Sequence, residues 1–230
     1  LTVIQVSENV GQLLKHNPGQ ILGQPIAALI SKACFEDLES KSRSSYLRNS
    51  TPFILSFKAG SSYLTMVHEK DECLIIEIEF RNELPATSHT FNSVFAKLQT
   101  VMSAINICRS IEEVATVSVK EIKSLSGFDK VMIYQFDDEY NGSVIAEEMD
   151  EGMDTYLGLK FPASDVPKQA RDLYLRNPYR TIPDRAYEPV NLTPNVNSLT
   201  GLPTNLSDCR LRSVIPVHLE YLKNMNVVAS

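Results

Sequence analysis

Apolar and polar residues alternate in short runs through the first third of the chain, a pattern typical of strands with one buried face. Residues 1–6 alternate in this way. Three later runs are rich in β-branched and aromatic residues, at 53–58, 63–68 and 73–80. Because short turn-forming segments separate these three runs, they predict an antiparallel meander.

Helical patterns flank these strands and dominate the middle of the chain. Short helices are predicted at 9–15, where Asn17-Pro18-Gly19 ends the helix, and at 26–30. Residues 1 to about 82 therefore form one small α+β unit. A long helix is predicted from Phe91 to Ile105, because apolar residues recur there at steps of three and four, a stripe that is usually core.

The second half alternates helices and strands. Ser110-Ile111-Glu112-Glu113 is a capping-box pattern that opens a second helix to about residue 125. Strands are predicted at 131–136 and 143–148, joined by a hairpin turn that ends in Asn141-Gly142. The acidic residues 150–154 predict a solvated loop, and 187–207, rich in Pro, Asn and Thr, predict a long functional or mobile loop. Residues 83–89 are the best candidate for a domain boundary.

Composition limits the class of protein. The chain has 230 residues, 43% of them hydrophobic, and a net charge of −6, which argues against nucleic acid and anionic membrane as partners. No apolar run reaches the length of about eighteen residues that a membrane span needs. The four cysteines are scattered without a CxxC pair, which favours a reduced cytoplasmic protein, and the four histidines show no metal-ligand spacing. No phosphate-binding glycine loop or nucleophile–base motif is visible, so we expect no enzyme activity in this part.

The most distinctive stretch is Phe161-Pro162-Ala163-Ser164-Asp165-Val166-Pro167. Its prolines fix the backbone at both ends, and Ser164 and Asp165 are expected to cap a helix over 168–175. On that helix Ala170, Leu173 and Tyr174 share a face, which predicts that Tyr174 points inward. Arg180 follows after a stiff turn. A rigid acidic loop beside aromatic residues, followed by an arginine, suits an apolar ligand with charged arms.

Three segments resemble the phytochrome family. Residues 161–167 are similar to its Pro-Ala-Ser-Asp-Ile-Pro motif, with Val166 for Ile; residues 131–136 resemble its Val-Met-x-Tyr-x-Phe strand; and residues 211–225 resemble its chromophore-site segment. The resemblance implies an α+β fold with a PAS domain at 1–85 and a GAF domain at 86–230, each an antiparallel sheet flanked by helices. Both domains are expected to be incomplete, in an excerpt of a longer polypeptide. The loop at 187–207 corresponds to the family's lasso, through which the segment before the PAS domain passes.

The resemblance also implies site residues for a linear tetrapyrrole. Arg180 and Arg212 fall at the positions that bind the propionates, although an arginine is more often a solvated surface residue. Asp165 falls at the aspartate whose main-chain carbonyl accepts hydrogen bonds from the pyrrole nitrogens. His218 falls at the histidine that lies against the inner pyrroles. The alternative for His218 is a core histidine whose hydrogen bonds are made within the protein. The resemblance implies further cofactor contacts at Tyr134, Phe161, Tyr174, Tyr221, Val166, Pro167 and Ser213. For the aromatic residues among them the alternative is plain core packing.

The sequence departs from the family pattern at four positions. Val217 stands where many members have the attachment cysteine, so no thioether can form there. Cys209 lies off that position and is expected to be structural. Ile215 replaces a Ser or Thr that could bind a propionate, and Asn226 replaces a Gly, a change that the turn tolerates because Asn accepts positive φ.

These resemblances imply a bacteriophytochrome-type red/far-red photoreceptor that binds biliverdin rather than phycocyanobilin. Photoisomerisation near Tyr134 and Tyr174 would signal to a downstream output, often a histidine kinase with its response regulator, in a homodimer to which the helix from Phe91 contributes. Two rivals of other classes stay open. One is a PAS–GAF sensor of a cyclic nucleotide or metabolite, and the other is a purely structural dimerisation module.

Overall fold

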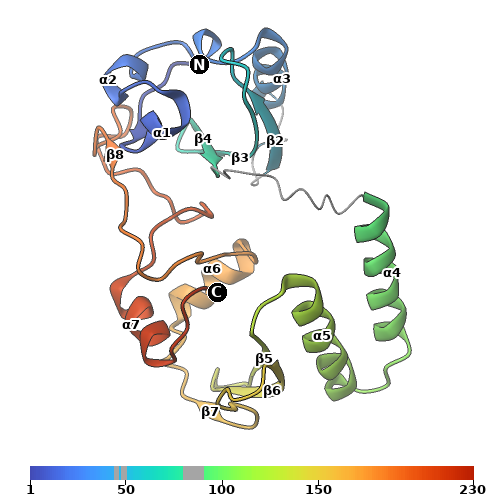
Figure 1. Cartoon of the computed structure of the whole chain (residues 1–230). Coiled ribbons are helices and arrows are strands. Elements are labelled where there is room, and N and C mark those ends of the chain that lie inside the picture. Colours follow the sequence, from blue (N-terminus) through green and yellow to red (C-terminus); the bar gives the residue numbers. More distant parts are fainter. Residues whose placement is uncertain (44–46, 48–50, 80–90) are drawn as a thin grey trace. The chain divides into compact units, whose positions relative to one another are not determined.

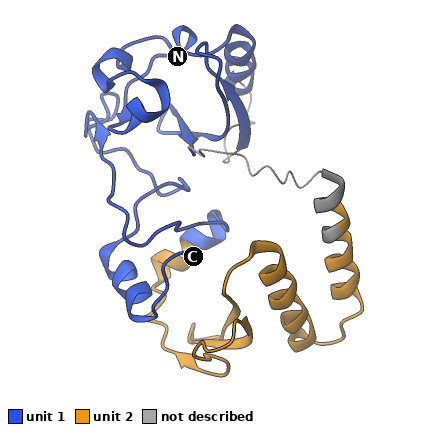
Figure 2. Cartoon of the chain, viewed as in Figure 1, with its two compact units in different colours: residues 1–82, 173–230 blue, residues 83–172 orange. Residues whose placement is uncertain are grey.

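The computed structural model describes residues 1–43, 47, 51–79 and 91–230, without the side chains of residues 91–94 and 97. Figure 1 follows the elements along the chain, and Figure 2 shows its two compact units, residues 1–82 with 173–230 and residues 83–172. The expected boundary at 83–89 lies outside the described residues. The division into a PAS domain at 1–85 and a GAF domain at 86–230 stays a prediction.

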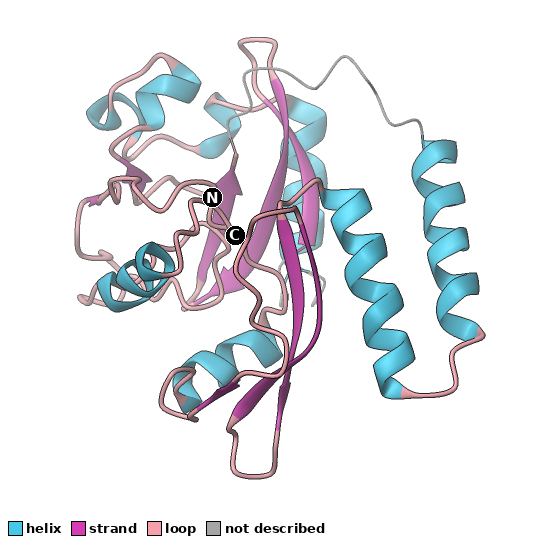
Figure 3. Cartoon of the chain, turned by 60° about the horizontal axis from the view of Figure 1, so that its bottom comes forward, coloured by secondary structure: helices cyan, strands magenta, loops and turns pink. Residues whose placement is uncertain are grey.

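A three-stranded sheet forms the centre of the first unit. Strands β2 (Thr51–Ser56), β3 (Ser62–Lys70) and β4 (Cys73–Ile78) pair antiparallel in that order, which confirms the meander (Figure 3). Alternate residues of β2 and β3 face one core, to which helix α3 (Lys32–Arg43) contributes Cys34 and Leu38. The fully buried members of this core are Ile30, Leu38, Leu47, Leu55 and Val67.

The helices of this unit match the sequence in part. Helix α1 (Val10–Leu14) and the 3-10 helix η1 (Ile26–Ala28) lie where short helices were predicted. Asn17-Pro18-Gly19 not only ends the first helix but starts another, α2 (Pro18–Ile21), because Pro18 fits the first helical position and Asn17 and Gln20 form a capping box. Helix α3 was not predicted, because most of its residues are polar.

The amino-terminal segment pairs with the long loop. Only Val6–Ser7 forms a strand (β1), so the strand predicted at 1–6 is wrong in extent, and Thr2 instead makes an isolated bridge to Pro25. Strand β1 pairs antiparallel with β8 (Leu192–Thr193) inside the predicted loop at 187–207. The Gln5 side chain extends this contact, since its amide donates to the Pro194 carbonyl at 2.7 Å and its oxygen accepts from the Thr204 hydroxyl. Helix α7 (Pro216–Asn224) completes the unit.

The second unit consists of a helix pair and a small sheet. Helices α4 (Phe91–Asn106) and α5 (Ile111–Ser126) precede β5 (Lys130–Phe136), β6 (Gly142–Met149) and β7 (Lys160–Phe161), which pair antiparallel in that order. The predicted cap is present, because the Ser110 hydroxyl accepts from the Glu113 amide at 3.1 Å. Ala115 and Val119 of α5 pack on Ala146 of β6. Helix α6 (Lys168–Arg176) follows. None of the described helices is long and apolar enough to cross a membrane.

Three residues of the apolar stripe of α4 are not core. Phe95, Leu98 and Met102 are exposed over 49%, 47% and 56% of their surface. The prediction of core packing is therefore wrong for these three positions. The other expectation for this helix, a contact between protomers, stays a prediction.

The buried core of the first unit leads to a test by truncation. Leu38→Ala should lower the free energy of unfolding by about 2–5 kcal/mol, because Leu38 is 0% exposed and its removal leaves a cavity. Leu64→Ala is the matched control. Leu64 is 69% exposed, so the change should stay within about 0.5 kcal/mol. Equal effects in denaturant titrations would contradict this packing.

Candidate functional site

The distinctive loop at 161–167 is fixed at both ends by side chains from its own unit. The Asp165 amide donates to the Pro162 carbonyl at 3.0 Å, which closes a turn. Arg171 of α6 donates from one guanidinium nitrogen to the Val166 carbonyl at 2.5 Å and to the Ala163 carbonyl at 3.4 Å. On the other side, the Asn141 side-chain oxygen accepts from the Ala163 amide at 3.3 Å. The backbone around Asp165 therefore has one defined course.

The predicted helix cap at this loop is wrong. Helix α6 begins at Lys168, and the amides of Ala170 and Arg171 donate to the Pro167 carbonyl. In the described part of the chain, no hydrogen bond joins the side chain of Ser164 or Asp165 to the helix. The Asp165 carboxylate is exposed instead.

Three aromatic rings pack beside this loop within the second unit. The ring of Tyr134 lies 5.1 Å from Phe136 in an edge-on arrangement and 5.8 Å from Phe161 in a tilted one, measured between centroids. Gly142 lies under the Tyr134 ring, since a Cβ built there would be 1.8 Å from Tyr134 Cζ. A glycine is needed at this position because the ring occupies the space of any side chain. The structure thus brings the expected contacts Tyr134 and Phe161 together.

The two expected propionate-binding arginines meet in the first unit. Arg180 Nη2 donates to the carbonyls of Arg212 and Ser213, at 3.2 Å each, and Arg212 Nη1 donates to the Cys209 carbonyl at 2.5 Å. Burial, and then the positive charge of Arg212, lower the pKa of Arg180, although a guanidinium stays charged in proteins. Arg180 Nε is buried and has no hydrogen-bond partner among the described residues.

The charge of this pair is not balanced by an ion pair within the described residues, where neither Arg180 nor Arg212 contacts a carboxylate. Two like charges held close by neutral carbonyls produce a positive potential. An orphaned donor at Arg180 Nε can pair with a planar carboxylate. The arrangement therefore fits an anionic arm of a ligand better than it fits a solvated surface.

His218 lies near the arginine pair on α7. Burial, and then the charge of Arg180, lower its pKa below the ordinary value of 6.5, so the imidazole is neutral at neutral pH. Asn226, just after α7, has φ of 54°, as the exchange for glycine predicted. Tyr221 is 38% and Val217 75% exposed on the same helix.

Tyr174 differs from its prediction. It was expected to point inward from α6, but 45% of its surface is exposed, whereas Ala170 and Leu173, the other members of the predicted face, are partly covered. Whether Tyr174, Tyr221, Val166, Pro167 or Ser213 contacts a ligand stays a prediction.

Cys209 has the environment of a structural cysteine. It is 2% exposed, and its sulfur lies 3.8 Å from His68 Nε2. Burial raises the pKa of its thiol to about 12, so it stays protonated and a poor nucleophile.

Several residues of the site carried no signal in the sequence. Arg171 and Asn141 fix the loop at 161–167, Tyr187 accepts from the Val214 amide at 2.6 Å, and Asn177 donates to the Asp208 carbonyl at 3.1 Å. Each acts on backbone groups 5 to 31 positions away in the chain, so no local pattern marks them.

Comparisons with known proteins show the family and the fold of the chain. A family model described as a PAS fold matches residues 1–81. The chain superposes on the chromophore-binding domain of Stigmatella aurantiaca phytochrome P1 with a TM-score of 0.85 and 38% identity, over 100% of this chain and 75% of that one. The chromophore-binding domain of an unusual bacteriophytochrome from R. palustris matches with a TM-score of 0.84 and 33% identity, over 100% and 74%. The chain belongs to the phytochrome family.

Relatives known by sequence extend this result. Cyanobacterial phytochrome B of Nostoc sp. is 37% identical over 100% of the chain and 31% of its own length. A bacteriophytochrome of Xanthomonas campestris is 50% identical over 57% of the chain and 22% of its own length. This phytochrome-family chain thus spans about a third or less of the length of these relatives, and its α+β fold is that of a PAS–GAF chromophore-binding domain.

The contact between Gly142 and Tyr134 gives a test of the aromatic cluster. Gly142→Ala should destabilise the phytochrome-family chain by about 1–3 kcal/mol, because the new methyl group overlaps the ring. The matched control is Gly19→Ala, where the added Cβ meets nothing within 4 Å. Thermal unfolding should separate the two variants, and a Gly142→Ala midpoint equal to that of the control would show that the ring lies elsewhere.

The lowered pKa of His218 predicts a pH dependence of stability. The unfolded chain binds this proton near pH 6.5 and the folded chain only at lower pH, so the contribution of His218 is present at neutral pH and lost on acidification through the folded pKa. His218→Gln should therefore lose less stability than the wild type between about pH 7 and pH 5. Parallel curves for His218→Gln and wild type would exclude the lowered pKa.

Proposed function

We propose that this phytochrome-family chain is the bilin-binding, light-sensing part of a red/far-red photoreceptor. The observation that carries the proposal is the convergence of Arg180 and Arg212, with a buried, unpartnered donor at Arg180 Nε. A bilin carries two propionates, and guanidinium groups pair with carboxylates in a planar, two-pronged geometry. A bound bilin would supply the conjugated system that absorbs red light and the methine double bond that rotates.

The protein's own groups have separable tasks in this proposal. Arg180 and Arg212 bind the propionates, and Ser213 lies in the same segment. The neutral imidazole of His218 can both donate and accept a hydrogen bond, which suits a group that exchanges a proton with the pyrrole nitrogens. The carbonyl of Asp165 accepts from those nitrogens, in a backbone whose course Arg171 and Asn141 fix. The rings of Tyr134 and Phe161 supply apolar surface.

The proposed chromophore is biliverdin. Val217 cannot form a thioether, and the Cys209 thiol is buried and protonated, so neither position offers an attachment site in the described part of the GAF region. We place any covalent bond outside residues 209–217. The proposed signal passes to a downstream kinase and its response regulator rather than to a catalytic group of this chain. The exposed apolar residues of α4 are proposed to contribute to a homodimer.

Bilin uptake tests the arginine pair. Each guanidinium–carboxylate contact stabilises binding by about 1.5–3 kcal/mol, so loss of each arginine should raise Kd by roughly 10- to 150-fold. Arg180→Ala with Arg212→Ala should therefore abolish uptake at concentrations of biliverdin that saturate the wild type. The measurement is an absorbance titration of the protein at its natural length, followed by red and far-red irradiation.

A double variant of the same charge change controls for electrostatics. Arg43→Ala with Arg109→Ala removes two exposed arginines and should leave uptake and photoconversion unchanged. Colourless wild-type protein would refute the photoreceptor and favour a PAS–GAF sensor of another small molecule. Equal uptake by the wild type and both double variants would refute the role of the arginine pair but not the photoreceptor.

A further inference from the structure

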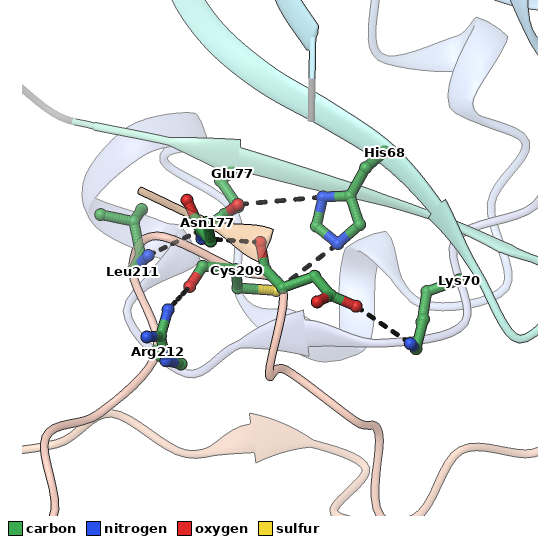
Figure 4. Close-up of polar contacts among 8 residues, drawn as sticks. His68, Lys70, Glu77, Asn177, Cys209, Leu211 and Arg212 are labelled. Carbon is green, nitrogen blue, oxygen red and sulfur yellow. Dashed lines mark hydrogen bonds and ion pairs between the residues drawn. The ribbon is translucent and has the colours of Figure 1, made fainter. Parts of the chain in front are cut away.

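A buried polar cluster joins the sheet of the first unit to the segment that carries Arg212. Figure 4 shows His68, Lys70 and Glu77 facing the segment that carries Cys209, Leu211 and Arg212. His68 and Lys70 come from β3 and Glu77 from β4, whereas the segment lies more than 130 positions later in the chain. Such groups are costly to bury unless they form specific contacts.

Glu77 makes the central contact of this cluster. The residue is 8% exposed, and its Oε2 accepts from the Leu211 amide at 2.7 Å (Figure 4). Leu211 is the residue directly before Arg212. A buried carboxylate that accepts from a backbone amide restricts where the chain lies at that residue, because moving the chain away would leave the carboxylate buried without that hydrogen bond.

The neighbouring contacts hold the same segment at other points. Lys70 pairs with Asp208 at 2.9 Å, and the Asn177 side chain donates to the Asp208 carbonyl. The Arg212 guanidinium in turn donates to the Cys209 carbonyl, so its direction depends on where residues 208–211 lie. Glu77 Oε1 and His68 Nδ1 face each other at 3.9 Å, and neither has a hydrogen-bond partner among the described residues.

We propose that Glu77 is a positioning residue for the chromophore: by accepting from the Leu211 amide, it fixes the segment that directs Arg212 toward a propionate. This inference rests on the proposed function. It makes the PAS sheet a determinant of bilin affinity, although Glu77 itself touches no part of the arginine's guanidinium. The hydrogen-bond acceptor is the essential feature, and the charge is secondary.

Electrostatics supports this assignment without carrying it. Burial raises the pKa of Glu77. Hydrogen bonds from the backbone amides of Leu211 and Arg210, and the charges of Arg210 and Arg212, partly offset this rise. His68, whose pKa burial lowers, faces the same carboxylate, and Cys209 and Asp208 lie on the far side of the imidazole. A neutral amide at position 77 can therefore replace the acid, with its oxygen toward Leu211 and its NH₂ toward His68 Nδ1.

The test compares Glu77→Leu with Glu77→Gln in the protein at its natural length. Glu77→Leu removes the acceptor of the Leu211 amide, which frees residues 208–212 to move, and should raise the Kd for biliverdin by roughly tenfold. Glu77→Gln keeps an acceptor and should restore the Kd to within about threefold of wild type. Hydrogen exchange of the Leu211 amide, measured without bilin, should be fast in Glu77→Leu and slow in Glu77→Gln.

Two controls separate positioning from general stability. Leu38→Ala lowers stability in the core of the same unit without touching residues 208–212, so its Kd should equal that of wild type. Glu69→Leu changes an exposed carboxylate on β3 and should alter neither the Kd nor the exchange. A merely structural role for Glu77 would give Glu77→Leu the behaviour of Leu38→Ala.

The outcomes distinguish this inference from the proposed function. If the wild type binds bilin and Glu77→Leu binds it equally well, the positioning role is wrong and the photoreceptor stands. If the wild type binds no bilin, the proposed function fails. Hydrogen exchange of the Leu211 amide then decides whether Glu77 fixes residues 208–212. Equal exchange rates in the wild type and Glu77→Leu would show that Glu77 does not fix this segment.

Discussion

The site depends on one constraint: Arg180 and Arg212 lie close together, and neither forms an ion pair with a carboxylate among the described residues. Arg180 reaches the carbonyls of Arg212 and Ser213 from the turn after α6, and its partial burial adds a desolvation cost to the repulsion between like charges. Such an arrangement persists only where the surrounding fold over-determines it. The same cost is why we propose that the pair binds carboxylates.

In the first unit, contacts from distant parts of the chain hold the segment that carries Arg212 in place. Glu77 and Lys70 of the PAS sheet hold the backbone before Arg212, and Asn177 holds it from the end of α6. The amino-terminal segment pairs with the long loop through β1 and β8. The sheet therefore does more than precede the segment that carries Arg212, since Lys70 and Glu77 contact that segment directly.

Local patterns predicted the elements that local forces determine. The meander, α5 with its Ser110 cap, and the β5–β6 hairpin all follow from periodicity and turn residues. Helix α3 escaped prediction because few of its residues are apolar, and the burial of α4 could not be read because it depends on what packs against the helix. The cap expected at Ser164 is absent from the described residues, where the first amides of α6 donate to the Pro167 carbonyl instead.

The candidate site depended on resemblance far more than on residue chemistry. A rigid acidic loop with an arginine downstream indicated only an apolar ligand with charged arms. The meeting of Arg180 with Arg212 was implied by the family and then found in the structure. The supporting contacts of Arg171 and Glu77 could not be predicted, because each joins a side chain to a backbone group through tertiary folding, which leaves no period or spacing in the sequence.

An experimental structure of the protein with bound biliverdin tests the central claim most directly. We expect each propionate within hydrogen-bond distance of a guanidinium, with Arg180 Nε donating to a carboxylate oxygen. Propionates that lie in solvent, with Arg180 and Arg212 still bound only to backbone carbonyls, would contradict the account.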